Sequence, residues 1–219
     1  MSSDVCRRVF FLAGVSGVGT SFAAEAAAAT GTSVNVAVDG LIAGCGPRLF
    51  DALDPFEAFE TALPRNYGDR WSTPPQDVLT EADAAAARYA PVFAEHLSEL
   101  ADNRRPVIVE GYAVVHPEIR AAILRAVEID GPPAEWRLGW LNPPADAVLV
   151  NRRHRAGFND FAVDHKTVAG DLHAYGVRLF QQRRPLTGRA VECVTADHAV
   201  LAARAWCEHG LFTSLAFRS

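Results

Sequence analysis

Lysine is nearly absent from this chain. Of its 21 basic residues only Lys166 is a lysine, and the others are arginines. Alanine is abundant at the same time, and the combination is typical of codon bias in a GC-rich genome. The balance of charge is acidic, with a formal net charge of −5. An acidic net charge argues against non-specific electrostatic binding to nucleic acid or to an anionic membrane. Local clusters of basic residues are still compatible with this charge.

Long apolar runs are also lacking. No stretch reaches the roughly 18 uninterrupted apolar residues of a membrane span. The first residues, MSSDVCRR, do not show the order of basic, apolar and small residues that a signal peptide has. We therefore expect a cytoplasmic protein without a membrane partner.

Cysteine is scarce and scattered. Cys6, Cys45, Cys193 and Cys207 form no C-x-x-C pair, so neither a zinc site nor a disulfide framework is indicated. Buried thiols are the simpler expectation.

The remaining composition, 49% apolar and 21% charged, is ordinary for a globular protein, and the length favours one domain over residues 1–219. Strand-like apolar runs alternate with helical stretches, which predicts an α/β fold with a parallel five-stranded sheet flanked by helices. Ligands of such sheets bind outside the carboxyl ends of the strands. The runs are Val9–Ala13, Ser33–Val38, Pro106–Val109, Trp136–Leu141 and Ala190–Val194.

Three longer segments complete the predicted organisation. Residues 43–79 are rich in proline, glycine and aromatics, and we interpret them as a cover over a substrate pocket. A long helix is expected over about 81–102. The region 151–185 carries an arginine-bearing helix and is predicted to form a lid.

Residues 14–21 read GVSGVGTS and lie between the first strand and an alanine-rich helix expected to begin at about Thr20 and to end before Gly31. A P-loop reads G-x-x-x-x-G-K-[ST], so Gly14, Gly19 and Ser21 match. Backbone amides of the turn and the helix N-terminus can still bind a phosphate, and Ser21 can hold Mg²⁺. The candidate phosphate-binding residues are Gly14, Val15, Ser16, Gly17, Val18, Gly19, Thr20 and Ser21. A structural glycine-rich turn is the alternative.

Thr20 stands where the P-loop lysine belongs. The change removes a point charge that would bridge the β- and γ-phosphates. The loop resembles that of some archaeal adenylate kinases, which also have a small residue at this position. The resemblance implies that activity without the lysine is allowed.

Two acidic residues follow predicted strands. Asp39 ends the stretch Val-Asp-Gly-Leu-Ile at 38–42, and Glu110 ends the third strand. A carboxylate at this edge can accept the proton of an attacking hydroxyl, or it can hold a metal ion. The two should lie on neighbouring strands. A turn aspartate and a strand-terminal glutamate facing solvent are the alternatives.

The stretch VDGLI resembles chloramphenicol phosphotransferase and its relatives among the small P-loop kinases. In that family a strand ending in V-D-x-L-I supplies the catalytic base, so the resemblance implies Asp39 as a base acting on an alcohol. Glu110 resembles the second acidic motif of P-loop proteins, and the resemblance implies that it holds Mg²⁺ through water or contacts the substrate hydroxyl. The family has the P-loop lysine that this chain lacks.

Arginines cluster after Leu141-Asn142-Pro143, in the sequence NRRHR at 151–155. Arg152 and Arg155 share a helical face and can point at one polyphosphate; a solvated helix face is the alternative. The segment resembles the start of the lid in small-molecule and nucleoside monophosphate kinases. Lys166 is a second candidate for the missing cation, with an exposed, solvated lysine as its alternative.

Two further features are weaker. Thr195-Ala196-Asp197 follows the last strand, where the family contacts adenine through backbone groups, although a helix cap at Asp197 explains the same residues. Aromatic side chains could line an acceptor pocket or belong to an ordinary core. They are Phe50, Phe56, Phe59, Tyr67, Trp71 and Tyr112.

Three functions are compatible with these residues. The first is an ATP- and Mg²⁺-dependent kinase that phosphorylates a hydroxyl of a small molecule, such as an antibiotic or a biosynthetic intermediate. The second is a nucleoside monophosphate kinase, and the third is a non-catalytic nucleotide-binding protein with a degenerate loop. The expected partners are a nucleoside triphosphate and a small-molecule acceptor, without nucleic acid, and the chain is expected to act alone or as a homodimer.

Overall fold

The computed structural model describes residues 7–14, 18–38, 84, 87, 90, 105–128, 133–144, 147 and 188–211. The secondary structure of these ranges follows the α/β order predicted from the sequence. In chain order the elements are β1 (Arg8–Gly14), α1 (Thr20–Ala28), β2 (Val34–Ala37), β3 (Val107–Glu110), the 3₁₀ turn η4 (Tyr112–Val115), α6 (Pro117–Val127), β4 (Glu135–Leu141), β5 (Ala190–Cys193) and α10 (Ala196–His209).

The five strands form one sheet in the order β2-β3-β1-β4-β5, and every neighbouring pair is parallel. Each of the five predicted strand-like runs is a strand, with ends that lie within one residue of the prediction. The register pairs Leu12 of β1 with Glu110 of β3, and Gly14 with Leu141 of β4. Because all strands run the same way, their carboxyl ends meet at one edge. The predicted fold class is confirmed.

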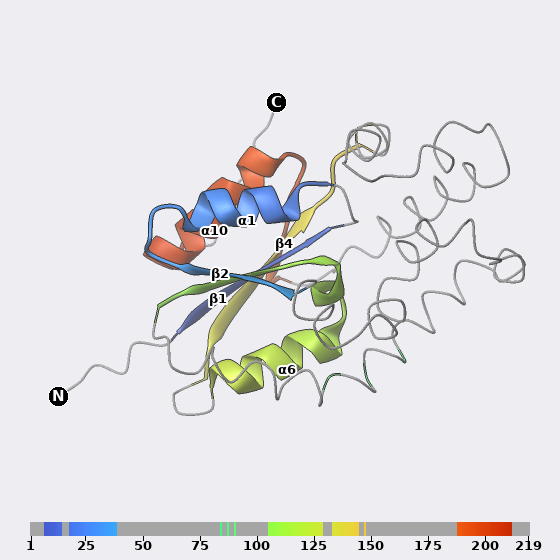
Figure 1. Ribbon diagram of the computed structural model, residues 1–219, viewed down its shortest axis with the longest axis vertical. Helices are drawn as coiled ribbons and strands as arrows, with labels where there is room; N and C mark the ends of the chain where they lie inside the picture. Colours follow the sequence, from blue (N-terminus) through green and yellow to red (C-terminus); the bar gives the residue numbers. More distant parts are fainter. Residues whose placement is uncertain are drawn as a thin grey trace, which may run out of the picture.

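Helices cover both faces of the sheet, with α1 and α10 on one side and α6 on the other (Figure 1). The central strand β1 is therefore enclosed on both faces, and residues from Val9 to Ala13 are fully buried. This is why it reads as a continuous apolar run rather than an alternating one. Helix α1 turns only alanines, Ala23, Ala24 and Ala27, toward the core, and it begins and ends where the sequence predicts.

Helix α10 is tied to the sheet and to α1 by buried polar contacts. The Trp206 indole N–H donates to the Val9 carbonyl at 3.1 Å, and the Arg204 guanidinium donates to the Ala26 carbonyl of α1 at 2.6 Å. The N-cap of α10 is Thr195, whose hydroxyl accepts the His198 amide at 3.1 Å. Asp197 lies in the first turn, so the alternative of a cap at Asp197 is wrong by two residues.

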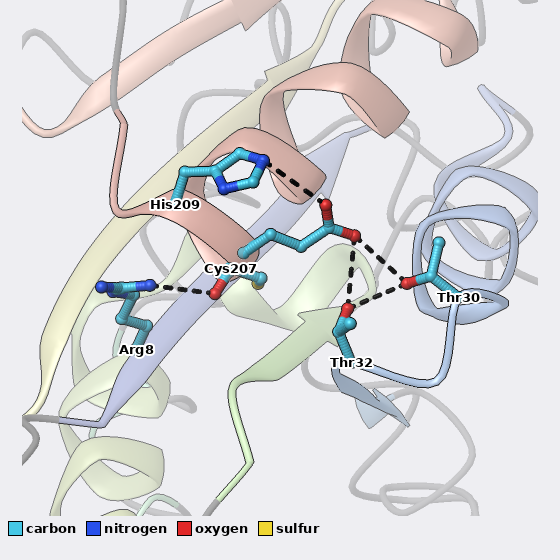
Figure 2. Close-up of polar contacts among 6 residues, drawn as sticks. Arg8, Thr30, Thr32, Cys207 and His209 are labelled. Carbon is cyan, nitrogen blue, oxygen red and sulfur yellow. Dashed lines mark hydrogen bonds and ion pairs between the residues drawn. The ribbon is translucent and has the colours of Figure 1, made fainter.

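A second set of contacts joins the far ends of α1 and α10 (Figure 2). The hydroxyls of Thr30 and Thr32 lie 2.8 Å apart and both donate to one carboxylate oxygen of Glu208. His209 lies 3.7 Å from the other oxygen. These contacts lie at the end of α1 away from Thr20, so the two helices are fixed to each other along their lengths.

The structure also bears on the cysteines and on three predicted segments. Cys193 and Cys207 are free and buried, and burial raises the pKa of both thiols to about 12, which confirms the expected buried thiols at these two positions. Cys6 and Cys45, the cover at 43–79 and the lid at 151–185 lie outside the described residues. Of the long helix expected at 81–102 only positions 84, 87 and 90 are described, and they are helical. Within the described ranges, every helix is too short or too polar to cross a membrane.

The cap assignment gives a test of this part of the fold. We expect Thr195→Ala to lower the stability by about 1 kcal/mol, because it removes the acceptor of the His198 amide. That corresponds to a fall of roughly 2–4 °C in melting temperature for a chain of this length. Asp197→Ala is the matched control, because the stability that it loses comes only from the interaction of the Asp197 charge with the helix dipole, which high salt screens. If Asp197→Ala costs more than Thr195→Ala at high salt, the cap is misassigned.

Candidate functional site

The glycine-rich turn lies at the carboxyl end of β1 and leads directly into α1. A Cβ atom added at Gly14 would lie 2.6 Å from a methyl group of Val18 and 2.8 Å from the Leu141 carbonyl oxygen. The turn therefore folds back so closely over β1 and β4 that only glycine fits at its start. Gly19, the N-cap of α1, has φ 97°, in the left-handed region that favours glycine. Val15, Ser16 and Gly17 lie outside the described residues.

The N-terminus of α1 lacks the usual protein partners. Its N-cap is a glycine, no side chain caps it among the described residues, and its first turn holds no acidic residue. The amides at the start of a helix have no acceptor within the helix, and the helix dipole makes this end positive. Together with the close glycine turn, this arrangement suits an anion such as a phosphate group.

A hydrogen bond joins the start of α1 to the end of β3. The Ser21 hydroxyl donates to Oε2 of Glu110 at 3.1 Å. Ser21 is exposed, whereas Glu110 is only 3% exposed. The structure thus brings together the two residues that the sequence predicts as metal ligands. The alternative for Glu110, a strand-terminal side chain facing solvent, is wrong.

The environment of Glu110 disfavours its charged form. Burial raises the pKa of this carboxyl above its ordinary value, and the charge of Glu25 adds to the rise. Hydrogen bonds from the Ser21 and Thr20 side chains lower the pKa and so offset part of the effect. Thr20 thus bonds to the acid but brings it no positive charge.

Most other predicted site residues lie outside the part of the chain that the structure describes. Asp39 lies outside the described residues, but the strand before it is described. This strand, β2, is next to β3, and Ala37 pairs with Glu110. The prediction that the two acids follow neighbouring strands is thus confirmed as far as the positions of the strands. The lid candidates also lie outside the described residues, as do the aromatic residues proposed for the acceptor pocket, apart from the backbone of Tyr112. The lid candidates are Arg152, Arg155 and Lys166.

The oxygen atoms at this edge fit a small divalent cation. Among the described residues there is no group of three or more His, Cys, Asp or Glu side chains that could hold a metal. Mg²⁺ needs no such group, since proteins hold it through one or two side chains while water and phosphate oxygens complete its shell. The Ser21 hydroxyl and the Glu110 carboxylate provide two oxygen ligands of the required kind.

Two features of this edge were not predicted. The Asn142 side-chain amide donates to Oε1 of Glu192 at 2.7 Å, which links the ends of β4 and β5. Phe22, next to Ser21 in the first turn of α1, is 63% exposed. The sequence does mark both positions, because Asn142 directly follows a predicted strand and Phe22 is the one large apolar residue of α1. It contains no motif from which the hydrogen bond of Asn142 or the exposure of Phe22 could be predicted.

Comparisons with known proteins identify the fold. No protein-family model and no curated protein matches the sequence. Among solved structures, a sugar kinase from Janibacter sp. HTCC2649 has 16% sequence identity and a TM-score of 0.51, and the match covers 92% of this chain and 94% of that one. A gluconokinase from Sinorhizobium meliloti 1021 has 16% identity and a TM-score of 0.47, with 91% and 93% covered. At this identity the sugar kinase shows a shared fold.

The raised pKa of Glu110 predicts how stability depends on pH. The folded protein holds the Glu110 proton to a higher pH than the unfolded chain does. The contribution of this proton to the free energy of unfolding is therefore complete below the pKa of the unfolded chain, and it is lost as the pH rises through the pKa of the folded protein. Glu110→Gln fixes a neutral side chain and should therefore melt above the wild type at pH 8. At pH 4 the two should melt together. Melting curves across this pH range measure the difference, with a substitution of the exposed Glu135, Glu135→Gln, as the control. A wild type that is more stable than Glu110→Gln at pH 8 would contradict the raised pKa of Glu110.

Proposed function

We propose that this protein is an ATP-dependent phosphotransferase that phosphorylates a hydroxyl group of a small molecule. The observation that carries the proposal is the hydrogen bond between Ser21 and the buried Glu110 beside the glycine turn. It combines an anion-binding helix N-terminus with two oxygen ligands suited to Mg²⁺, at the edge where such sheets bind ligands. The fold shared with a sugar kinase supports the same reaction class.

In this proposal the backbone amides of residues 14–21 bind the phosphates of ATP. Positive charge, which the P-loop lysine supplies in related loops, comes instead from Arg152 and Arg155 in the lid, with Lys166 as a further source. Guanidinium groups bind phosphate oxygens through several donors at once. Ser21 and Glu110 would hold Mg²⁺, which neutralises charge on the β- and γ-phosphates during transfer.

Asp39 would act as the general base. It accepts the proton of the acceptor hydroxyl while the hydroxyl oxygen forms a bond to the terminal phosphorus and the bond from that phosphorus to the leaving ADP breaks. Positioning and electrostatic stabilisation supply most of the rate in such reactions. We assign the cover at 43–79 to the acceptor, a hydroxyl-bearing compound such as a sugar, an antibiotic or a biosynthetic intermediate.

A non-catalytic nucleotide-binding protein is the second candidate. One observation favours it, namely that Thr20 leaves the described part of the loop without a cationic side chain, beside an acid whose charged form is already disfavoured.

The base assignment can be tested by Asp39→Asn. We expect turnover to fall by roughly 10²–10⁴-fold, the usual contribution of a general base, while the affinity for MgATP stays unchanged, because the phosphate-binding residues are intact. ADP release with a panel of sugars, polyols and nucleoside monophosphates measures turnover, and calorimetry measures binding. Glu135→Gln, at the opposite edge of the sheet, is the control. Unchanged turnover in Asp39→Asn would defeat the assignment, and phosphorylation of nucleotides alone would favour a nucleoside monophosphate kinase.

Restoring the lysine separates the two candidate functions. If the site lacks only charge, Thr20→Lys should raise turnover about tenfold, equivalent to about 1.4 kcal/mol of transition-state stabilisation. Thr20→Met is the matched control, since it has a side chain of similar length without the charge. A protein that binds ATP tightly but turns over no acceptor, with or without the lysine, would instead be non-catalytic.

A further inference from the structure

The chain leaves the sheet immediately after Glu110. Gly111 has φ 138°, in the region that favours glycine, and its N–H donates to the Leu12 carbonyl at 3.2 Å, the last bond between β3 and β1. The 3₁₀ turn η4 begins at the next residue and leads into α6. The position of η4 therefore determines the path of the backbone on the carboxyl side of Glu110.

One side chain holds the far end of this turn. A single guanidinium nitrogen of Arg120, on α6, donates to the carbonyls of Val114 at 2.7 Å and Val115 at 2.8 Å. Both valines are buried. Without a donor, buried carbonyls lose the hydrogen bonds they would make with water in the unfolded chain, so the bridge fixes η4 strongly.

Arg120 is itself fixed against the sheet. Its guanidinium lies 5.9 Å from the centre of the Trp136 ring on β4, within the range of a cation–π interaction. The Trp136 ring packs edge-on against Phe11 of β1, with ring centres 5.9 Å apart and an angle of 73° between the planes. Burial lowers the pKa of Arg120, but an arginine remains charged in a protein. A continuous set of contacts thus runs from the core of the sheet through Arg120 to η4.

We propose that Arg120 is a positioning residue for Glu110. Hydrogen bonds of the sheet hold Glu110 from its amino side, and Arg120 holds it from its carboxyl side through η4 and Gly111. The consequence for Mg²⁺ rests on the proposed function, in which Glu110 is a metal ligand. A shift of this backbone would move the carboxylate away from Ser21 and weaken the metal site, even though Arg120 touches neither the metal nor a substrate.

A purely structural role for Arg120 is the competing explanation, so the experiment needs readouts that are specific to Glu110. Arg120→Lys keeps the charge, but its terminal nitrogen is one bond closer to the backbone than the guanidinium nitrogen that donates to both carbonyls, so it falls short of them. Arg120→Met keeps only the apolar stem. Arg125→Ala, an exposed arginine on the same helix, is the control. If Arg120→Met does not fold, Arg120→Lys alone carries the test.

The first readout needs no ligand. Amide hydrogen exchange at Gly111 should become at least about tenfold faster in Arg120→Lys, whereas exchange at the Asn142 amide, which donates to the Cys193 carbonyl across the sheet, should not change. The second readout is the ratio of ATP affinities with and without Mg²⁺, measured by calorimetry. This ratio should fall at least about fivefold in Arg120→Lys and stay at the wild-type value in Arg125→Ala.

The proposal would be overturned if exchange rose equally at Gly111 and Asn142, or did not rise at all, while the ratio of ATP affinities with and without Mg²⁺ stayed unchanged. Arg120 would then be a structural residue. If the wild type binds no ATP in either condition, the proposed function fails on its own account. The exchange at Gly111 would still decide whether Arg120 holds the backbone next to Glu110.

Discussion

The candidate site depends on the contact between Ser21 and Glu110. It joins two segments far apart in the sequence, the start of α1 and the end of β3, and it exists because β1 and β3 are neighbouring parallel strands whose carboxyl ends meet. The tight turn at Gly14 brings α1 back over the sheet, and the small alanines of α1 let the helix lie close to it. The rest of the candidate site is arranged around this contact.

The burial of Glu110 also creates an electrostatic problem. Glu110 is buried and carries a raised pKa, and the neighbouring Thr20 supplies a hydroxyl and no positive charge. A triphosphate would add further negative charge. Peptide dipoles at a helix N-terminus are worth only about half a charge, so the proposed function requires positive charge from the lid and from a divalent cation. The same requirement explains why the position of Glu110, and hence the rigidity of the turn after it, matters.

Much of this arrangement could be predicted from the sequence. The strands could be found because strands buried on both faces read as apolar runs, and the start of α1 because a glycine-rich turn precedes it. The proximity of Ser21 and Glu110 follows from the parallel topology together with the glycine turn that leads into α1. The N-cap of α10 was placed at Asp197 instead of Thr195, because both are good capping residues and the sequence pattern does not separate them. The contacts of Arg120 could not be predicted, since an arginine on an amphipathic helix usually faces solvent and its partners here are backbone carbonyls, which leave no pattern in the sequence.

The central claim is that the glycine turn, with Ser21 and Glu110 beside it, binds a magnesium nucleoside triphosphate without the P-loop lysine. Titration calorimetry of the wild-type protein and of Ser21→Ala with MgATP and MgGTP tests it most directly. We predict saturable binding by the wild type that weakens in Ser21→Ala when Mg²⁺ is present. Absence of binding by the wild type to either magnesium nucleotide would contradict it.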